Sequence, residues 1–489
     1  MSFWRSKNNT GQVKHDFSHI LNRAGYLALG KDYNQIMCSL VQKYNIPGPR
    51  YTSYPTVPYW DLNSFSGKKW EESVAHSFKA TNSKEGMSLY IHLPFCESMC
   101  TFCGCHKRIT KRHDVELPYV HAILKEWKLY RILFSEKAMI KELHLGGGTP
   151  TFFSPENLKK LIMGIFRYAH KAENAELSFE GHPNNTTRAH LQALYDVGFR
   201  RVSYGVQDYN LTVQKAIHRV QPFENVKRVT DWAREIGYTS VGHDIIFGLP
   251  HQTLKHVEET ILKTKELQPD RLAFYSYAHV PWMQGNGQRG YKDSDLPSAD
   301  EKRQQYEKGK ALLIDVGYHE IGMDHFALES DTLYQSMEAG KLHRNFMGYT
   351  ASKTSLMVGL GASSISDSWY GFAQNVKSLE EYQHLVENDI IPIFRGHILN
   401  KEDQIVRRHI LNLMCNFETS WDTHRGYLSE MDSIQDSLAE MSADGLIVMR
   451  EGHLKITSKG KPFVRNICMA FDLRLQRKAP ETKLFSMTV

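Results

Sequence analysis

Four of the chain's seven cysteines lie within ten residues, and their type and spacing indicate chemistry more clearly than any other group. Cys96, Cys100 and Cys103 have a C-x3-C-x2-C spacing, and Cys105 follows two residues later. Three thiolates on one loop can bind three irons of a cubane [4Fe–4S] cluster and leave the fourth iron open. An open iron can chelate the amino and carboxylate groups of a methionine moiety, so that one electron can enter a sulfonium and break a C–S bond.

Other uses of these cysteines have to be weighed. The first residues, MSFWRSKNN, lack the apolar segment of a secretory signal, so we expect a cytoplasmic protein in which disulfides are disfavoured. Zinc normally takes four ligands, commonly from two separated pairs, and the sequence has no second pair. A site that uses all four thiols would be strained by the short spacing from Cys103 to Cys105. Cys38, Cys415 and Cys468 stand alone in apolar segments and are interpreted as small buried residues.

A glycine triplet is the second chemical signal. The word GGGTP (146–150) directly follows the predicted strand Lys141–Leu145. Glycines allow a ligand to approach the backbone closely, and free N–H groups there can bind a carboxylate or another polar partner. Such a triplet alone is more often a plain turn. Its place at a strand end, after the cysteine loop, favours a ligand site.

The elements that must position these residues alternate in type. Short β-type runs and amphipathic stretches follow one another, which favours a parallel sheet with helices outside it. Ligands in such proteins lie at the carboxyl ends of the strands, where both chemical signals fall. The predicted strands are Ser88–Phe95, Lys141–Leu145, Glu176–Glu180, Arg201–Val206, Ser240–Phe247 and Arg271–Tyr277, and the predicted helices are Leu117–Leu133, Asn157–Ala169, Arg188–Val197, Phe223–Ile236 and Leu254–Leu267.

The pattern changes beyond about Val376. Helical periodicity dominates there, followed by a short strand pair with a turn at 451–452, and this order resembles a winged-helix module. We therefore expect an N-terminal extension (1–50), a catalytic domain (51–375) and a C-terminal helical domain (376–489). The predicted C-terminal elements are the helices Ser378–Asn388, Lys401–Cys415 and Tyr427–Asp444 and the strands Gly445–Val448 and His453–Ile456.

Composition sets limits on the class of protein. A chain of 489 residues with 41% hydrophobic and 23% charged residues is typical of a globular protein of two or three domains. Its longest apolar run, near Leu161–Phe166, is far shorter than the roughly 18–20 residues of a membrane span. The net charge of +6 is modest and no tract is dense in Lys and Arg, so we expect no nucleic-acid partner. We expect a monomer without a membrane span.

The combination of CxxxCxxC, GGGTP and the α/β alternation resembles the radical S-adenosylmethionine (SAM) superfamily. Further short sequence motifs resemble those of the oxygen-independent coproporphyrinogen III oxidases, from about Tyr44 to the C-terminus. The resemblance does not explain residues 1–42. The resemblance implies an α/β fold: a partial (β/α)6 radical SAM barrel with an N-terminal extension and a mainly helical, winged-helix-like C-terminal domain. The words are GPRYTSYPT (48–56), YIHLPFC (90–96), FCGC (102–105), GVQDYN (205–210), IIFGLP (245–250), GMDHFA (322–327), LHRNF (342–346) and VRNICMAFD (464–472).

The resemblance also implies an activity in heme biosynthesis. Two propionate side chains of coproporphyrinogen III would be oxidatively decarboxylated to vinyl groups, giving protoporphyrinogen IX. A 5′-deoxyadenosyl radical from SAM would abstract hydrogen from the β-carbon of a propionate, and loss of carbon dioxide and one electron would leave the vinyl group. The implied cofactors are a [4Fe–4S] cluster and two SAM molecules. The implied partners are coproporphyrinogen III and an unidentified electron donor and acceptor.

Site residues follow from the resemblance, position by position. It implies Cys96, Cys100 and Cys103 as cluster ligands, and Cys105 as a catalytic non-ligand beside them. A carboxylate such as Asp244 can bind ribose hydroxyls, and an arginine such as Arg219 can pair with a methionine carboxylate. For one such residue alone, a structural ion pair or strand-end hydrogen bond would be the better interpretation, and four polar residues on successive strand ends favour ligand contacts instead. The implied SAM contacts are Tyr90, Phe102, Gly147, Gly148, Thr149, Glu180, Gln207, Arg219 and Asp244, with Ala278 and Ile365 at the second SAM.

One departure from the family lies at 180–183, where the run is Glu-Gly-His-Pro and an Asp is often found after Glu-x. Glu180 itself is kept, so the departure concerns local hydrogen bonding. His92, within a β-run, fits either a core or a catalytic histidine.

The substrate's four propionates call for cationic donors, and Arg50 and Arg344 lie in words specific to the family. His279, Asp324, His325 and His343 are further polar residues that could meet propionates or serve the fold.

Competing functions remain open at this level. A heme chaperone paralogue without oxidase activity typically carries a His-Asn-x-x-Tyr-Trp word where this chain has His-Arg-Asn-Phe (343–346). A radical SAM methyltransferase that opens heme is a second alternative. A nucleic-acid-binding role for the C-terminal module is a third, and salt-dependent DNA retention would be its sign.

Overall fold

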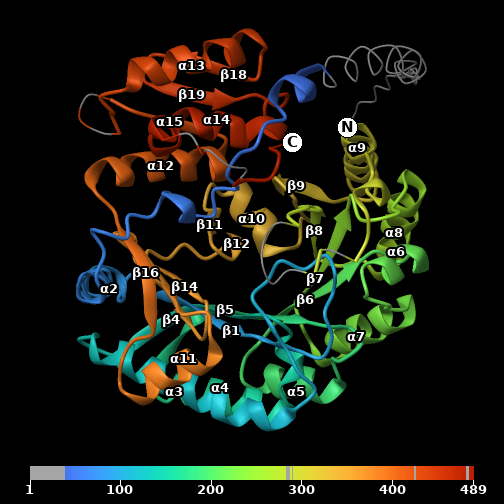
Figure 1. The fold of residues 1–489 in the computed structure, drawn as a ribbon, viewed down its shortest axis with the longest axis vertical. Helices are drawn as coiled ribbons and strands as arrows, with labels where there is room; N and C mark the ends of the chain where they lie inside the picture. Colours follow the sequence, from blue (N-terminus) through green and yellow to red (C-terminus); the bar gives the residue numbers. More distant parts are fainter. Residues whose placement is uncertain are drawn as a thin grey trace, which may run out of the picture.

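The computed structural model describes residues 39–281, 287–288, 290–422, 424, 426–478, 480 and 484–488. They form a large central sheet with helices on its outer side and a helical module at one end (Figure 1). Cys38 and most of the predicted N-terminal extension lie outside the described residues. No helix of the described part is long and apolar enough to cross a membrane, and the cytoplasmic location stays a prediction.

The predicted alternation of strand and helix is confirmed. Six neighbouring parallel strands form the centre of the sheet, and the helices between them pack on its outside (Figure 1). The strands are β1 (Met87–Leu93), β4 (Ala138–Gly147), β5 (Ala169–Gly181), β6 (Arg201–Gln207), β7 (Ser240–Phe247) and β8 (Arg271–Ser276). The helices are α3 (Glu116–Ile132), α4 (Pro155–Phe166), α5 (Arg188–Asp196), α6 (Leu211–Ala216), α7 (Phe223–Ile236), α8 (Leu254–Leu267) and, after β8, α9 (Ala299–Asp315).

Local chemistry marks the ends of these helices. The side chain of Thr187 accepts a hydrogen bond from the backbone N–H of His190 at the start of α5. Thr253 does the same for His256 at the start of α8. Capping of this kind satisfies N–H groups that have no partner within the helix. Gly237, with φ +112°, ends α7 in the left-handed conformation that glycine adopts easily.

The sheet also extends beyond the predicted strands, on both sides. β13 (Met357–Leu360) pairs in parallel with β1, and β14 (Ile365–Asp367), β15 (Gly371–Asn375) and β16 (Ile393–Ile398) follow as antiparallel strands. On the other side, β10 (His325–Ala327) and β9 (His319–Gly322) follow β8. The order begins with β16 and ends with β9, so the barrel is partial. The expected domain boundary at 376 falls within the sheet, because β16 pairs with β15.

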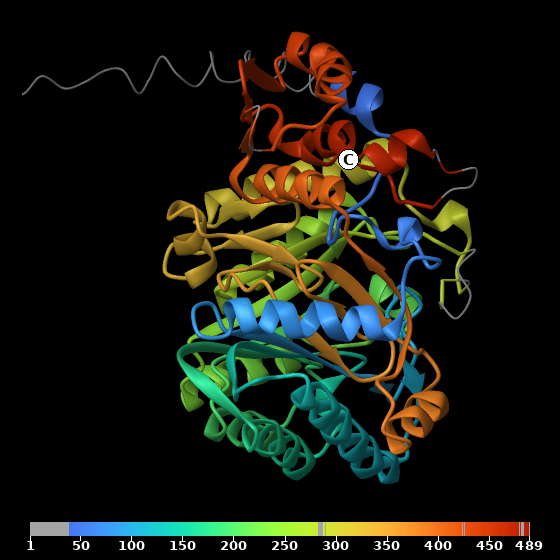
Figure 2. The ribbon, with the colours of Figure 1, turned by 90° about the vertical axis from the view of Figure 1, so that its left-hand side faces the viewer.

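The C-terminal module has its own core and lies at one end of the molecule (Figure 2). The predicted helices and strand pair are present, although α13 begins at Met431 rather than near Tyr427; the likeness to a winged helix stays a prediction. Tyr51 and Tyr54 from the segment before the sheet are buried in this core. The module consists of α12 (Lys401–Asn416), α13 (Met431–Ala443), α14 (Val464–Phe471), α15 (Leu473–Arg477), β17 (Glu418–Ser420), β18 (Ile447–Arg450) and β19 (His453–Ile456).

Shorter elements complete the fold. The helix α2 packs against the β15–β16 side of the sheet (Figure 2). Cys415 and Cys468 are buried, as predicted. The remaining elements are α2 (Gly67–Thr81), α10 (Thr332–Glu338), α11 (Leu379–Glu387), β2 (Phe95–Cys96), β3 (Arg108–Ile109), β11 (His343–Asn345), β12 (Gly348–Thr350) and the 3-10 turns Val57–Tyr59, His113–Val115, Pro150–Phe152, Asp293–Asp295 and Lys461–Phe463.

Candidate active site

The cysteine loop leaves the sheet at the carboxyl end of β1. Cys96 ends β2, which pairs in parallel with β3, and the carbonyl of Cys96 accepts a hydrogen bond of 2.9 Å from the N–H of Thr110. Thr101 ties the far side of the loop to the end of α6 by donating to the carbonyl of Ile217 at 3.0 Å. Cys96, Cys100 and Cys103 are half-buried, whereas Cys105 is exposed. The loop is therefore anchored at both ends.

The thiols of this loop influence one another. Burial raises the pKa of Cys96 to about 11, a hydrogen bond with the Thr149 hydroxyl at 3.3 Å opposes this, and the nearby Cys103 and Cys100 raise it further. The pKa of Cys103 is lowered to about 6, chiefly by a hydrogen bond from Cys105. Binding of a metal cluster requires all ligand thiols to be deprotonated.

The donor set fits a cubane cluster better than a single ion. No three Cys, His, Asp or Glu side chains of the described chain converge in the way that one metal ion demands. A [4Fe–4S] cluster binds each thiolate through a different iron, so its ligands surround a cube instead of meeting at a point. The three half-buried thiols follow one another on a single loop, and the resemblance assigns them to such a cluster. A closed tetrahedral zinc site does not fit this arrangement.

The glycine turn after β4 packs tightly against the strand that carries the cysteines. A Cβ atom on Gly147, where φ is +117°, would lie 2.8 Å from the ring of His92. A Cβ atom on Gly148 would lie 2.6 Å from the backbone carbonyl of Pro94 and 2.9 Å from that of Phe95. Both distances are too short for real contacts, so the turn needs glycine in order to sit under the cysteine loop.

The backbone amides of this turn are already used. Gly148 donates to the carbonyl of Leu93 at 2.8 Å, and Thr149 donates to the carbonyl of Phe95 at 3.0 Å. The expectation of free N–H groups at the glycine word is therefore wrong for these two residues. They anchor the turn to the cysteine loop, and a bound ligand would meet carbonyl groups or the Thr149 hydroxyl instead.

His92 has a hydrogen-bond partner at each of its ring nitrogens. Its Nδ1 lies 3.0 Å from the Tyr90 hydroxyl and its Nε2 lies 3.0 Å from the carbonyl of His106. Burial lowers its pKa to about 4, so the ring is neutral at physiological pH. Since both ring nitrogens have partners, His92 joins β1 to the end of the cysteine loop, which favours the core interpretation.

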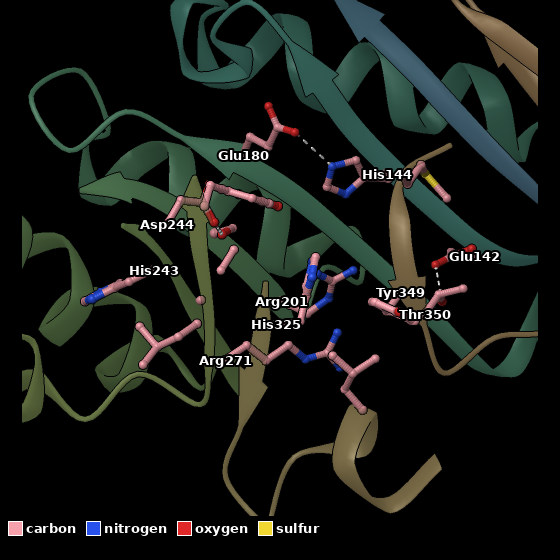
Figure 3. Close-up of a pocket in the computed structure, with 17 residues that line it drawn as sticks. Glu142, His144, Glu180, Arg201, His243, Asp244, Arg271, His325, Tyr349 and Thr350 are labelled. Atoms are coloured by element: carbon pink, nitrogen blue, oxygen red, sulfur yellow. Dashed lines mark hydrogen bonds and ion pairs between the residues drawn. The ribbon is translucent and has the colours of Figure 1, made fainter. Parts of the chain in front are cut away.

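Acidic residues from β5 and β7 line one cavity inside the barrel (Figure 3). Oε1 of Glu180 lies 3.4 Å from Nε2 of His144, and the hydroxyl of Ser203 donates to Oδ1 of Asp244 at 3.1 Å. Burial and, next, the charge of Glu180 raise the pKa of Asp244 to about 7. Both carboxyl groups line a cavity of about 110 Å³. The structure therefore brings together two of the strand-end residues predicted from separate strands.

A layer of charged side chains lies in and beside this cavity, and the sequence reasoning missed it (Figure 3). Arg201 pairs with Glu176 at 2.8 Å, and Arg271 pairs with Asp331 at 2.6 Å. Glu142 is buried and accepts from the hydroxyl of Thr350 at 2.7 Å. The sequence does contain a signal for this layer, because polar residues alternate along the strands, such as Glu142 with His144 and Arg201 with Ser203. Alternate residues of a strand share one face, which here is the inner face of the barrel.

The next predicted site residues, toward the cysteine loop, are Arg219 and Gln207. Arg219 donates to the carbonyl of Gly205 at 2.7 Å and to Sγ of Cys100 at 3.8 Å. In the described chain, Nε of Arg219 and Oε1 of the buried Gln207 are without a hydrogen-bond partner. Gln207 also has φ +69°, which is uncommon for a residue other than glycine. Unsatisfied buried groups in a strained segment indicate a place where a ligand completes the bonding.

The remaining predicted contacts are Phe102, Ala278 and Ile365. Nε2 of Gln288 donates to the carbonyls of Phe102 and Ala278, both at 3.0 Å, and so links the cysteine loop to the chain after β8. Ile365 lies on β14, two strands beyond β1 on the other side. Along the order of the sheet, Ala278 after β8 and Ile365 on β14 therefore flank the strands that carry the other predicted residues.

The predicted cationic residues Arg50 and Arg344 lie together. Arg50 forms an ion pair with Asp324, and Nη2 of Arg344 donates to the carbonyl of Arg50 at 3.3 Å. Arg344 is buried and stacks over the ring of Tyr349 at 4.5 Å. His279, in contrast, pairs with the exposed Asp293 at 3.0 Å.

His325 and His343 are both buried, and burial lowers the pKa of each to about 3. They are neutral at physiological pH and therefore offer a propionate no positive charge.

Comparison with known proteins agrees with this geometry. The family model described as the radical SAM superfamily matches residues 90–263, which span β1 to α8. A solved structure of coproporphyrinogen III oxidase from Escherichia coli, whose title calls it a radical SAM enzyme, superimposes with a TM-score of 0.81 at 36% identity. It covers 87% of this chain and 97% of its own. Fold and site define a radical SAM enzyme, which uses a [4Fe–4S] cluster and SAM.

Similar proteins show which family of radical SAM enzymes the chain belongs to. The oxygen-independent coproporphyrinogen III oxidase of Synechocystis sp. is 37% identical over 465 residues, covering 93% of this chain and 98% of that protein. The corresponding protein of Salmonella typhimurium is 38% identical, covering 90% of this chain and 96% of that protein. The chain therefore belongs to the oxygen-independent coproporphyrinogen III oxidases.

Proposed function

We propose that this chain oxidatively decarboxylates two propionate side chains of coproporphyrinogen III to vinyl groups and so forms protoporphyrinogen IX in heme biosynthesis. The observation that carries the proposal is the anchored three-cysteine loop with Arg219 against it and Glu180 and Asp244 on the neighbouring strands, in a chain that aligns with nearly the full length of oxidases of this name. Each turnover transfers one hydrogen atom, releases carbon dioxide and passes one electron to an acceptor. An electron donor is needed as well.

Cys96, Cys100 and Cys103 are the residues we assign to the cluster. When bound, the cluster would supply the electron for the cleavage of SAM, and the adenosyl group so released would take up the hydrogen that the substrate loses. The protein's own contribution near the thiols is charge and position. The guanidinium of Arg219 lies beside Cys100, and Lys107 donates to the carbonyl of Cys103 at 3.1 Å. Positive groups of this kind favour a thiolate-bound cluster of net negative charge.

Our proposed SAM site consists of the predicted residues at and near the strand ends. The free donor of Arg219 and the free acceptor of Gln207 suit the carboxylate and ammonium groups of a methionine moiety. Asp244 and Glu180 suit ribose hydroxyls. Tyr90, Phe102, Gly147, Gly148 and Thr149 shape the wall next to the cysteine loop, and Ala278 and Ile365 extend the site to a second SAM. Because these groups are held by strand ends, they orient the cofactor and exclude water from the radical.

Cys105 is assigned a role beside the cluster but outside it. It is exposed, and its thiol hydrogen-bonds to Cys103. A thiol in that position lies near the reacting groups without replacing a cluster ligand.

The test is an anaerobic incubation of the reconstituted protein with coproporphyrinogen III, SAM and a chemical reductant, with product chromatography after oxidation of the porphyrinogens. We expect harderoporphyrin-type monovinyl and then divinyl product, with one 5′-deoxyadenosine formed for each vinyl group. The control omits SAM. Stoichiometric heme binding without any vinyl product would replace the oxidase by the heme chaperone, and a ring-opened product from heme would indicate the methyltransferase.

A further inference from the structure

A second, larger cavity lies outside the barrel interior, where the ends of β7 and β8 meet α9, residues 41–50 and the C-terminal module. Its volume is about 750 Å³, within the range of roughly 300–1,000 Å³ typical of pockets that enclose organic ligands. Large apolar side chains form much of its wall, among them Phe247, Tyr277, Tyr306 and Phe417. Ala278 also lines it, so a ligand here would lie against the position proposed for the second SAM.

Cationic side chains gather at one side of this cavity. Arg50, Lys302 and Arg465 line it, and Arg344 contacts Arg50 from behind through the 3.3 Å hydrogen bond. The carboxylate that faces this group is Asp324, which pairs with Arg50. Among the other acidic residues of the wall, Glu320 is bound by Lys310 at 2.7 Å, Asp293 by His279 at 3.0 Å, and Asp300 is exposed. Positive charge is therefore in excess on this side.

The cationic side chains donate hydrogen bonds to uncharged backbone carbonyls, which do not neutralise their positive charge. Nζ of Lys302 donates to the carbonyl of Tyr277 at 2.7 Å, and Arg465 donates to the carbonyls of Pro49 at 2.9 Å and Met487 at 2.8 Å. Burial and, next, the positive charge of Arg50 lower the pKa of Lys302 to about 8 and that of Arg465 to about 9. These cations repel one another, which is costly unless an anion joins them.

Arg344 is a further buried cation, next to Arg50. Its side chain is 5% exposed, and its Nε and Nη1 have no hydrogen-bond partner in the described part of the chain. A guanidinium stays charged in proteins, and a buried charge that no anion pairs carries a large desolvation cost. Arg344 lies behind Arg50 and does not line the cavity itself, so it adds positive charge next to the wall that an anion in the cavity would meet.

We propose that the 750 Å³ cavity is the porphyrinogen pocket, with the macrocycle against its apolar wall and a propionate carboxylate bound between Lys302 and Arg50, supported by Arg344. The proposal rests on the proposed function for the identity of the substrate. It adds the place where the substrate binds and the residues that select a carboxylate-bearing tetrapyrrole. It also places the porphyrinogen beside Ala278, at the SAM end of the barrel.

The experiment measures binding apart from turnover. Coproporphyrin III, the stable oxidised form with the same four propionates, is titrated by fluorescence into the anaerobic, cluster-loaded protein. We expect Lys302→Met and Arg344→Met each to weaken binding tenfold or more. Arg188→Met removes an exposed cation that pairs with Glu235, and it should stay within twofold of the parent protein. The tetramethyl ester of coproporphyrin, which lacks the negative charges, should bind all four proteins with similar, weak affinity.

The readouts separate a binding role from a structural one. Because Lys302→Met removes a charge repelled by Arg50, we expect its melting temperature to equal or exceed that of the parent protein while porphyrin affinity falls. Should Arg344→Met fold poorly, Lys302→Met and the cavity-filling Ala299→Trp still decide the question, since Ala299 lines the cavity. Unchanged coproporphyrin affinity in Lys302→Met and Ala299→Trp would overturn the proposal.

Failure of this proposal is distinguishable from failure of the proposed function. Vinyl production by the parent protein, with unaltered KM in Lys302→Met and Ala299→Trp, refutes the pocket and leaves the oxidase in place. Charge-dependent porphyrin binding that Lys302→Met abolishes, in a parent protein that forms no vinyl product, supports the pocket and refutes the oxidase.

Discussion

Arg219 contacts both the cysteine loop and strand β6 with one side chain. Its Nη1 lies 3.8 Å from Sγ of Cys100, and its Nη2 lies 2.7 Å from the carbonyl of Gly205. The guanidinium thus fixes the distance between a proposed cluster ligand and the proposed SAM site. Its Nε is buried and has no partner within the described residues, which leaves one donor for the cofactor.

We expect Arg219→Ala to weaken SAM binding by about tenfold or more, because a charge-assisted hydrogen bond is worth roughly 1.5–3 kcal/mol. Arg219→Lys keeps the charge beside Cys100 but cannot make both contacts, so it should recover cluster stability more than SAM affinity. Equilibrium dialysis with SAM and the cluster absorbance give the two quantities. SAM affinity equal to that of the parent protein in Arg219→Ala would return this residue to a purely structural role.

Loss of any proposed cluster ligand should remove the cluster. The reconstituted parent protein should carry about four irons on this loop, and Cys96→Ser, Cys100→Ser and Cys103→Ser should each abolish them. Cys415→Ala, at a buried cysteine away from the loop, is the matched control and should keep full iron content. Iron analysis with electron paramagnetic resonance checks the result, and a full cluster in one of the three serine variants would contradict its assignment.

Cys105→Ser should separate cluster assembly from turnover. Because Cys105 is exposed and bonds to a ligand thiol without being one, we expect the variant to retain iron and SAM binding while vinyl formation is lost. Complete absence of iron would make Cys105 a ligand instead.

Gly148→Ala should damage the cluster loop without touching a cysteine. The added methyl would lie 2.6 Å from the Pro94 carbonyl, a backbone group that cannot rotate away. We expect at least half of the iron to be lost and SAM binding to fall. Gly67→Ala is the matched control, since a Cβ atom there meets nothing within 4 Å. Equal iron content in the two variants would show that the turn and the loop are not packed as described.

Asp244→Asn should stabilise the cofactor-free protein at high pH. Burial and then Glu180 raise the pKa of Asp244 to about 7, above the value of about 3.9 expected in the unfolded chain. Ionised Asp244 therefore costs stability: the cost is absent below pH 3.9, grows as pH rises and is complete above about 7. We expect a gain of ~2–4 kcal/mol at pH 8 and little difference near pH 4, measured by thermal unfolding.

The same substitution should weaken SAM binding, since the carboxylate proposed to accept the ribose hydroxyls is gone. A lower melting temperature of Asp244→Asn at pH 8, or an effect independent of pH, would contradict this account of Asp244.

Much of the central sheet could be predicted from the sequence. The bounds of β7, α7 and α8 agree with the prediction to the residue, because each is a strongly patterned segment between clear turn signals. The cysteine loop and the glycine word were also placed correctly at the carboxyl ends of β1 and β4. Whether the predicted site residues bind as proposed is for the experiments to decide.

The parts missed have physical reasons. β14 and β15 are three and five residues long, and their partners are fixed by tertiary packing instead of a local pattern. The buried pairs of Arg201 with Glu176 and of Arg271 with Asp331 were not predicted, because charged residues in a strand look like surface residues until the barrel encloses them. The free amides expected at Gly148 and Thr149 are occupied, since the close approach that glycine permits was already used by β1.

The position of β1 between β4 and β13 has a consequence for synthesis and folding. Ser88 pairs with Glu142 on one side and with Met357 on the other. During translation β1 can pair early with β4, but its second edge stays open until the chain has grown past β13. Exposed strand edges promote aggregation, and contacts this distant in sequence form slowly. Chaperone supply and the timing of iron delivery are therefore expected to govern the yield of active protein, because the cysteine loop emerges from the ribosome long before its strand is enclosed.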